Sequence, residues 1–320
     1  MCPKVTAPVV SMIIGHGRDA MRRLIGLCAL LGAGAFSVAV VGGQGQTAQA
    51  PLPDLVKVKD NLYMIAASSP ADRSTFTGGN TGVFITANGV VVVDTKLAGY
   101  GRLILDRIRA VTDKPVTTII NTHTHGDHTG SNEGFPATVE IVAHENTKSN
   151  MERMDAFKGD KAKFLPKRTY KDTLSLFSGK DRVDLYYFGP GHTSGDTFVV
   201  YPALRVVQTG DMFPWKDAPF LDRANGGSGL ELPGTLKKAL AGIKNVDTVV
   251  PGHSPVMAWK DLEEFQRFNA DLVAAVREAF AGGKSADAAA ASINLTDKYK
   301  GYKSERVKAA VESIYGELKK

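Results

Sequence analysis

The sequence predicts an α/β (α+β) fold built as a single domain of residues 51–320, in which two β-sheets pack together and helices cover both outer faces. Strand-like segments followed by a helix-like segment fill the first half of that region, and the same order recurs in the second half. No Gly/Ser-rich linker separates the halves, which favours one domain over two. Because each sheet and each helix must bury an apolar face, this order of elements is typical of a layered structure.

The first half consists of strand-like segments and one helix. Apolar and polar residues alternate at its start, Asn88 and Gly89 form a typical hairpin turn, and the valine run at 90–93 is typical of a buried strand. Apolar residues then recur at helical spacing ahead of Pro115. The expected elements are strands at 56–66, 80–86, 90–93 and 116–122 and a helix at 100–111.

The second half is again rich in strands and ends in helices. A long amphipathic helix is predicted at 259–281, because Leu262, Phe265 and Leu272 fall on one face. The stretch 158–182 holds eight Lys or Arg residues against three aspartates, and we interpret it mainly as solvated surface. The other expected elements are strands at 138–143, 182–189, 197–202, 204–211 and 246–250 and helices at 145–157, 233–243 and 304–319.

Residues 1–50 are predicted to be a signal peptide that is removed from the mature protein. Arg22 and Arg23 precede an apolar run at 24–41, and a polar stretch then ends in Ala-Gln-Ala at Ala50. Glycines dilute the run and no charge flanks its end, which favours cleavage over stable membrane insertion. Met21 would be an ordinary start for such a leader. This pattern predicts a periplasmic or secreted protein.

Removal of the leader also changes the charge and the chemistry that are available. Residues 1–50 carry four basic residues and one acidic residue, so the mature chain keeps 35 basic and 32 acidic residues and a formal charge of +3. A charge this small and an export signal argue against a nucleic-acid partner and for a small-molecule substrate. Both cysteines, Cys2 and Cys28, lie in the leader, so the mature chain has no thiol for a disulfide, a nucleophile or a metal ligand. The sequence does not fix the oligomeric state.

The segment 121–130, NTHTHGDHTG, concentrates metal-binding residue types at the end of a predicted strand. His123 and His125 are two positions apart, so in an extended backbone their imidazoles point the same way. Asp127 and His128 follow where the chain enters a helix and can turn toward a second point. Zinc binds neutral imidazole nitrogens and carboxylate oxygens. One loop therefore provides ligands for two metals.

Three further turns carry single residues of the same types. His192 lies in GPGHTSGD, Asp211 in QTGDMF and His253 in VVPGHSP; each follows a predicted strand and has a glycine within two residues. Loops at the ends of strands are where layered folds present their sites. We therefore expect these side chains to join the histidine cluster. His144, in VAHEN, is interpreted as a helix cap or a residue near the cleft rather than a ligand.

The pattern His-x-His-x-Asp-His, followed by a distant His, Asp and His on glycine-flanked turns, resembles the metallo-β-lactamase-fold hydrolases, which include zinc β-lactamases, glyoxalase II and lactonases. The resemblance spans residues 55–260 and implies an αββα four-layer sandwich with two metals at one edge. It implies His123, His125 and His192 as ligands of the first metal, Asp127, His128 and His253 as ligands of the second, and Asp211 as a bridge. It also implies that Asp94 braces the ligand loop without touching metal. An aspartate at 211 and the lack of cysteine make the pattern more similar to glyoxalase II and the lactonases than to cysteine-bearing lactamases.

The chemistry implied is hydrolysis with Zn²⁺ as the cofactor, two ions per chain. A water shared by two cations loses its proton near neutral pH, and the resulting bridging hydroxide attacks a polarised carbonyl. Asp127 is the candidate catalytic residue, as a proton shuttle to the leaving group. In the loop after Asp211, Lys216, Arg223 and Asn225 are candidate substrate-binding residues.

The preferred function is therefore an exported binuclear zinc hydrolase that opens a lactam, lactone or ester and acts like a β-lactamase. A lactonase or thioesterase of the same fold is an alternative. A mononuclear iron sulfur dioxygenase and a non-catalytic zinc-binding protein are two others. Metal analysis separates them, because the hydrolase requires about two zincs per chain and the dioxygenase one iron.

Overall fold

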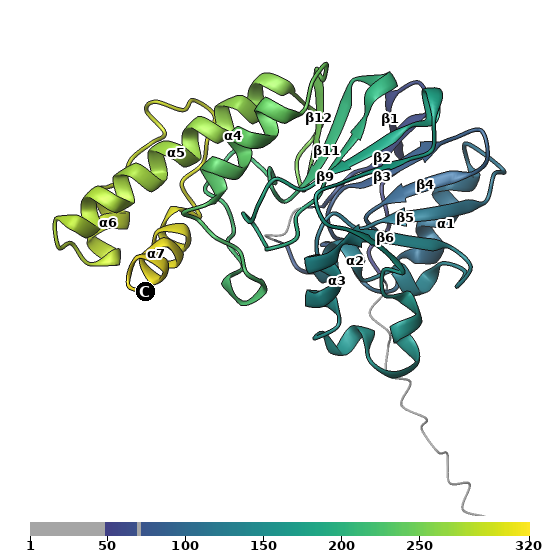
Figure 1. The fold of residues 1–320 in the computed structure, drawn as a ribbon, viewed down its shortest axis with the longest axis horizontal. Coiled ribbons are helices and arrows are strands. Elements are labelled where there is room, and N and C mark those ends of the chain that lie inside the picture. Colours follow the sequence, from purple (N-terminus) through teal and green to yellow (C-terminus); the bar gives the residue numbers. More distant parts are fainter. Residues whose placement is uncertain (1–48, 69–71) are drawn as a thin grey trace, which may run out of the picture. The chain divides into compact units, whose positions relative to one another are not determined.

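The computed structural model describes residues 49–68 and 72–320, which belong to one compact unit. The predicted leader lies outside the described residues apart from Gln49 and Ala50. Two sheets run through the unit (Figure 1). The first has seven strands in sequence order, β1 (Leu55–Lys59), β2 (Leu62–Ile65), β3 (Thr81–Ile85), β4 (Val90–Val93), β5 (Val116–Ile120), β6 (Glu140–His144) and β7 (Arg168–Tyr170). The second has six, β8 (Thr173–Leu176), β9 (Val183–Tyr186), β10 (Phe198–Tyr201), β11 (Val206–Gly210), β12 (Thr248–Pro251) and β13 (Met257–Ala258).

Helices connect and cover these sheets. The α-helices are α1 (Gly101–Arg109), α2 (Gly126–Thr129), α3 (Glu145–Met151), α4 (Leu232–Gly242), α5 (Trp259–Ala281), α6 (Ala286–Ser292) and α7 (Val307–Leu318). Short 3₁₀ helices occur at Asn132–Gly134, Asp155–Phe157, Gly159–Phe164, Gly179–Asp181, Pro202–Leu204 and Arg223–Asn225. Within the described part of the chain, none of the helices has the length and apolar character that crossing a bilayer requires.

Alternation along the strands divides the interior into separate cores. In β4, Val91 and Val93 face the core between the sheets, where they join Val199 and Tyr201 of β10. Val90 and Val92 point the other way, toward a second core that α1 completes with Ile104. A strand with a period of two and apolar residues at every position is expected when both faces of its sheet are covered.

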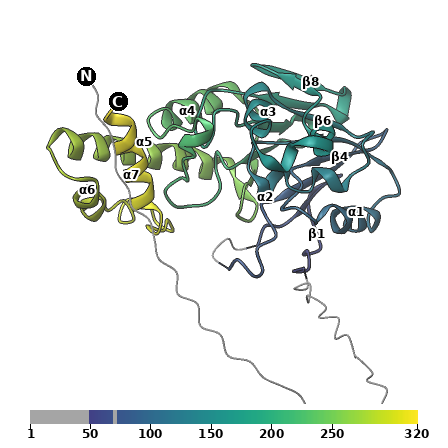
Figure 2. The same ribbon diagram turned by 90° about the horizontal axis from the view of Figure 1, so that it is seen from below.

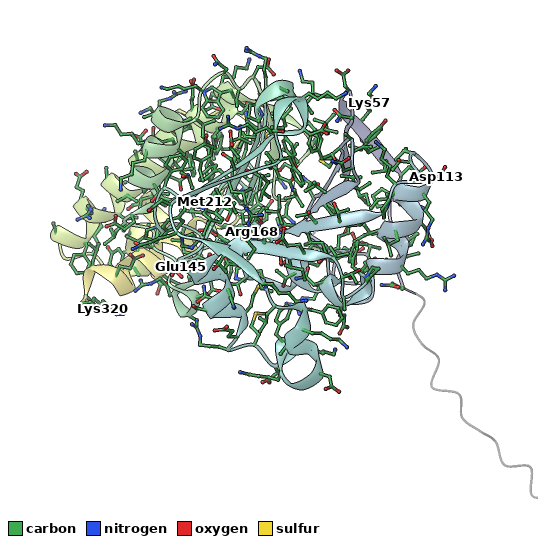
Figure 3. The ribbon with its side chains drawn as sticks, turned by 45° about the vertical axis from the view of Figure 1, so that its right-hand side comes forward. Lys57, Asp113, Glu145, Arg168, Met212 and Lys320 are labelled. Carbon is green, nitrogen blue, oxygen red and sulfur yellow. The ribbon has the colours of Figure 1, made fainter. Side chains whose placement is uncertain are left out.

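A third core lies between the second sheet and the C-terminal helices. Phe198 of β10 contributes to it together with Leu236 of α4, Phe265 of α5 and Val311 of α7. Met212, which follows β11, lies among the side chains that fill this space (Figure 3). In both ribbon views α1 lies on one side of the sheets and α4, α5 and α7 lie on the other (Figure 1, Figure 2). The four layers confirm the αββα sandwich that the sequence predicts.

Parallel strand pairs bring separate loops to one edge of the sandwich. In the first sheet β4 pairs in parallel with β5, and β5 with β6; in the second sheet β11 pairs in parallel with β12. Helix α1 connects β4 to β5, and α4 connects β11 to β12. Because parallel neighbours end at the same edge, the loops that follow these strands meet there.

The structure differs from the predicted elements in a few places. The basic stretch 158–182 contains two short strands, β7 and β8, whose outward residues such as Thr173 are exposed while Leu176 is buried. Helix α6 and strand β13 were not predicted, because an alanine-rich turn of helix and a two-residue strand have little periodicity. The helix predicted at 145–157 ends at Met151, and after a turn at 152–154 a separate 3₁₀ helix covers Asp155–Phe157.

Candidate metal centre

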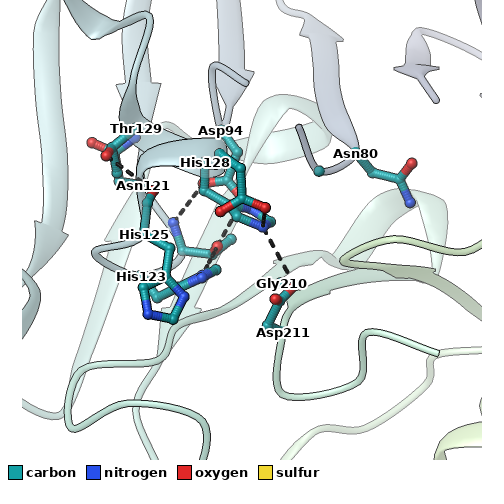
Figure 4. Close-up of polar contacts among 12 residues, drawn as sticks. Asn80, Asp94, Asn121, His123, His125, His128, Thr129, Gly210 and Asp211 are labelled. Atoms are coloured by element: carbon teal, nitrogen blue, oxygen red, sulfur yellow. Dashed lines mark hydrogen bonds and ion pairs between the residues drawn. The ribbon is translucent and has the colours of Figure 1, made fainter. Parts of the chain in front are cut away.

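The structure brings all seven sequence-predicted ligand residues together at the edge where the parallel strands end. The loop between β5 and α2 and the single turn of α2 supply four of them, and the loops after β9, β11 and β12 supply the rest. The potential ligand atoms form two groups, within each of which they lie within 4.8 Å of one another. The groups are His123, His125, His192 and Asp211, and Asp127, His128 and His253. Figure 4 shows the side chains from the first loop converging with Asp211 beside Asp94.

Hydrogen bonds fix which imidazole nitrogens of the first group face its centre. Thr122 Oγ1 donates to Asp94 Oδ2 at 2.7 Å, so it accepts from Nδ1–H of His123 at 3.0 Å. Nε2 of His123 is then unprotonated, and among the described residues this buried atom has no hydrogen-bond partner. A buried nitrogen lone pair without a donor is the expected state of a metal ligand.

The other two imidazoles of the first group are oriented in the same manner. His192 Nδ1–H donates to the carbonyl of Phe220 at 2.8 Å, and His125 Nε2–H donates to Asp222 Oδ2 at 2.7 Å. The remaining nitrogens, Nε2 of His192 and Nδ1 of His125, are 2.9 Å apart. Two lone pairs at this distance repel each other unless they share a cation.

The second group is built on His128 and His253. Nδ1–H of His128 donates to Asp94 Oδ2 at 2.8 Å, which leaves Nε2 to face Nε2 of His253 at 3.3 Å. Asp127 Oδ2 lies 3.3 Å from Nε2 of His253 and 3.7 Å from Nε2 of His128. At tetrahedral angles, zinc bonds of about 2.0–2.1 Å separate two ligand atoms by about 3.3 Å. These spacings fit a shared cation.

Asp211 lies between the two groups. Its Oδ1 is 3.4 Å from Nε2 of His128, and its Oδ2 is 3.3 Å from Nε2 of His253 and 3.6 Å from Nε2 of His192. Gly252 permits this approach, because a Cβ there would lie 1.9 Å from Asp211 Oδ1. Both oxygens thus approach the second group, and Oδ2 also approaches the first, so this carboxylate is suited to link two cations.

The electrostatics of the cluster keep two imidazoles neutral and surround the others with negative charge. Burial lowers the pKa of His123 well below its ordinary value and also lowers the pKa of His192, so both imidazoles stay neutral. Burial would raise the pKa of Asp127, but His128 and His253 outweigh it and lower this pKa to about 2. Burial alone would lower the pKa of His128. The negative charges of Asp127, Asp211 and Asp94 outweigh this effect and raise the pKa of His128 well above its ordinary value. The negative field that holds a proton there also attracts a metal cation.

A buried support lies beneath the ligand loop. Asp94, whose φ is 63°, accepts from the backbone N–H of Thr122 at 2.8 Å in addition to the bonds already described. Lys96 is completely buried, and its Nζ donates to the carbonyls of Ala66 at 2.9 Å and Gly79 at 2.7 Å. Burial lowers the pKa of Lys96 to about 7. Gly79 is held against the His128 ring, where a Cβ would lie 2.3 Å from Cε1.

Asp222 is a functional candidate that the sequence did not reveal. It accepts from His125 and also from Asn225, at 2.6 Å from the side-chain amide and at 3.1 Å from the backbone N–H. The hydrogen bond from His125 holds the pKa of Asp222 well below its usual range. The local signal was an aspartate three residues before Asn225 at the start of a 3₁₀ turn, but its histidine partner lies 97 positions away.

Replacing Asp222 with alanine is expected to weaken metal binding at the first group roughly 10- to 100-fold, the usual effect of removing a carboxylate that orients a ligand histidine. Without this acceptor, His125 loses the bond that keeps its Nδ1 free. Competition against a chromophoric chelator measures the affinity. Asp222→Asn retains an acceptor oxygen and should therefore lose less metal affinity than the alanine variant. An alanine variant with unaltered metal affinity would show that His125 does not need a hydrogen-bond acceptor at this position.

The three predicted substrate-binding residues occupy different environments. Lys216 pairs with Asp261 at 2.7 Å and Glu264 at 3.2 Å. Arg223 donates to the carbonyl of Ser313 at 3.0 Å and pairs with Glu317 at 3.4 Å, and Asn225 bonds to Asp222. Their contact with substrate stays a prediction. His144 caps α3 by accepting from the N–H of Asn146 at 3.2 Å, which agrees with its interpretation as a cap.

A cleft of about 430 Å³ opens above the cluster. Its lining residues are His125, Gly126, Asp127, Asp211, Trp215, Phe220 and Arg306. Three of these belong to the potential ligand set, so a molecule in the cleft would lie directly against the metal-binding groups. Phe220, which is 46% exposed, stands at the mouth with its ring centroid 5.8 Å from that of His125.

Comparison with known proteins agrees with this geometry. Among curated proteins, the chain is 27% identical to the metallo-beta-lactamase type 2 of Elizabethkingia meningoseptica over 225 residues, which cover 68% of this chain and 84% of that protein. It is 34% identical over 100 residues to the 2,4-dinitroanisole O-demethylase subunit alpha of Nocardioides sp. (strain JS1661), covering 31% of this chain and 29% of that protein.

The solved structures show the same fold. The metallo-beta-lactamase from Pontibacter korlensis superposes with a TM-score of 0.59 at 20% identity, covering 68% of this chain and 99% of that protein. Residues 74–253 match the model of the metallo-beta-lactamase superfamily. Since that match spans more than half of the sequence and contains all seven clustered His and Asp residues, the chain belongs to the metallo-β-lactamase superfamily.

Proposed function

We propose that this chain is an exported binuclear zinc hydrolase that attacks the carbonyl carbon of a lactam, lactone or ester and breaks its acyl C–N or C–O bond, with β-lactamase-like activity. Membership of the superfamily indicates a metal-dependent hydrolase. The observation that supports two metals is the pair of donor groups with Asp211 between them. Five imidazoles and two carboxylates, with no thiolate, make a donor set that suits zinc.

When bound, two zinc ions would supply an activated water and polarise the substrate carbonyl. The chain's own proton carrier is Asp127. Its side chain is 21% exposed and lines the cleft, whereas that of Asp211 is 7% exposed. A pKa of about 2 keeps Asp127 ionised at neutral pH, which is the form that binds a metal. Its place in the cleft makes its carboxylate our candidate for passing a proton from water to the leaving group.

Aromatic residues shape the cleft above these groups. Trp215 and Phe220 line it, and both come from the loop after Asp211. Their rings present apolar walls that exclude water from the reacting carbonyl and strengthen the electrostatic interactions inside the cleft. A substrate with an apolar or aromatic group beside its carbonyl suits this surface.

We also propose that the protein is exported from the cytoplasm. This inference depends on the predicted leader at 1–50 and agrees with a mature chain that holds no cysteine. N-terminal sequencing of the protein from an expressing bacterium, after separation of the periplasm, should give a chain beginning at Pro51. Recovery of the full-length chain in the cytoplasm would contradict it.

The function is tested by metal analysis and a hydrolysis screen on the purified protein. The panel contains nitrocefin, carbapenems, acyl-homoserine lactones, thioesters and sulfate or phosphate esters. We expect about two zincs per chain and turnover of a carbonyl substrate that chelation abolishes and added zinc restores. Lactone or thioester turnover without β-lactam turnover selects the alternative hydrolases of this fold, one iron per chain selects the dioxygenase, and metal without turnover selects a binding protein.

A further inference from the structure

Arg306 is a cation at the wall of the metal-side cleft that the reaction described above does not use. Its guanidinium carbon lies 4.1 Å from the centroid of the Trp215 ring, and both residues line the cleft together with Asp127 and His125. Arg306 lies beyond residue 253, where the superfamily match ends. The C-terminal part of the chain therefore contributes a charged residue to a cleft whose metal-binding groups come from the matched region.

The segment that carries Arg306 is fixed to the body of the protein. Tyr302 and Val307, on either side of it, are buried in the core of the C-terminal helices. The backbone N–H of Lys303 donates to the carbonyl of Lys216 at 2.9 Å, and Trp215 Nε1–H donates to the carbonyl of Ala218 at 3.3 Å. A guanidinium stacked on an anchored ring loses little further freedom when it binds an anion.

Other basic residues near the cleft already have anionic partners. Lys216 pairs with Asp261 and Glu264, Arg223 with Glu317, and Lys303 with Glu305 at 3.4 Å. Among residues 49–68 and 72–320, no carboxylate lies within ion-pair distance of the Arg306 guanidinium, and this side chain is half-buried. The carboxylate of Asp217, which lines the second cavity, is attracted to the charge of Arg306 but forms no ion pair with it. An incoming anion would thus meet a guanidinium without having to break a direct ion pair.

Arg306 and Trp215 also line a second cavity of about 570 Å³, together with His253, Ser254 and Met257. Trp215 and Arg306 are the two residues that line both cavities. A molecule whose carbonyl lies against Asp127 and whose remainder extends into the second cavity must pass Arg306. Arg306 would then contact the part of that molecule that lies between the reacting carbonyl and the distal end.

We propose that Arg306, stacked on Trp215, binds a carboxylate of the substrate, so that the enzyme prefers acyl compounds that carry an anion next to the reacting carbonyl. The planar guanidinium pairs with a carboxylate through two parallel N–H···O bonds, a geometry that lysine does not offer. This inference rests on the proposed function for its reaction, but the binding step is measured separately from turnover.

The first test compares two activated esters of equal length. One is the mono-para-nitrophenyl ester of succinic acid, with a free carboxylate, and the other is its methyl ester, which is neutral. Arg306→Gln should raise KM for the charged ester roughly tenfold or more, as expected when a charge-assisted bond is removed, and leave the neutral ester unchanged. Arg306→Lys should give a KM between the two, and Lys300→Gln, which removes an exposed charge six positions earlier in the chain, should match the unaltered protein. Equal effects on both esters, or on neither, would overturn the proposal.

The second test requires no turnover. Calorimetry on the full chain compares N-phenylsuccinamate, an amide with a carboxylate, with neutral N-phenylbutanamide. The unaltered protein should bind the acid more tightly, and Arg306→Gln should abolish the difference; this result supports the inference even if the ester screen shows no hydrolysis. If Arg306→Gln keeps the preference, or Lys216→Ala removes it instead, the inference fails whatever the catalytic activity.

Discussion

Replacing Asp211 with alanine is expected to reduce the metal content below two ions per chain and to lower kcat roughly 10³-fold. Asp211 is the carboxylate that reaches both donor groups, with oxygens 3.3 to 3.6 Å from Nε2 of His128, His192 and His253. A metal contributes several kcal/mol of transition-state stabilisation, and about 4 kcal/mol corresponds to that factor in rate. Metal analysis by plasma emission spectrometry and steady-state kinetics measure the two effects.

Asp211→Asn is the matched control, because it keeps the size of the side chain and removes its negative charge. If the charge holds the ions, the asparagine variant should lose metal nearly as completely as the alanine variant. Circular dichroism and a thermal melt then establish that both variants remain folded. An alanine variant that keeps two metals and full turnover would exclude Asp211 as a bridge.

Replacing Asp94 with alanine should reduce both stability and metal affinity. The substitution leaves three buried donors without an acceptor, the backbone and hydroxyl of Thr122 and Nδ1 of His128. It also places alanine at a φ of 63°, a left-handed backbone that alanine tolerates less well than aspartate. Since each unsatisfied buried group costs about 1–3 kcal/mol, we expect the free energy of unfolding to fall by about 3 kcal/mol or more. The affinity for metal at the His128 group should fall roughly 10- to 100-fold.

Asp94→Asn separates the backbone effect from the loss of the acceptor. Asparagine tolerates a left-handed backbone and retains one oxygen, so its loss of stability in urea denaturation should be clearly smaller. Its loss of metal affinity should approach that of alanine, because the charge that faces His128 is gone. Two variants with equal stability to the unaltered protein would show that Asp94 does not support the loop.

The helical and sheet layers of the sandwich could be predicted, because an element with a buried face carries apolar residues at a regular spacing. Helix α5 was predicted with its observed bounds, since apolar residues recur at helical spacing over 259–281. Strand β4 was recognised from consecutive valines, which fit a strand covered on both faces. Strands β7 and β8 were not recognised, because they have only three and four residues. Leu174 and Leu176 of β8 do alternate with polar residues, but so short an alternation is hard to distinguish within a stretch rich in Lys and Arg.

The ligand set was also visible in the sequence, because imidazoles and aspartates on glycine-rich turns are rare elsewhere in the chain. Asp222 and Arg306 were not, since their importance arises from tertiary proximity alone. Asp222 is one acidic loop residue among many until folding brings it to His125. Arg306 belongs to a C-terminal segment that no motif connects with the cleft, and its role depends on the ring of Trp215 beneath it.

The two crossovers β4–α1–β5 and β11–α4–β12 have a consequence for how the protein acquires its ions. The first crossover leads into the loop that carries four of the seven donor residues, beginning with His123. The second has Asp211 at its start and His253 at its end, and His192 belongs to neither crossover. Neither crossover holds a complete set, so an ion in solution encounters its full coordination sphere only after the halves of the chain have docked. Free zinc should therefore stabilise the folded protein only after the two crossovers have packed together. The rate of the earlier collapse of the chain should not depend on the zinc concentration.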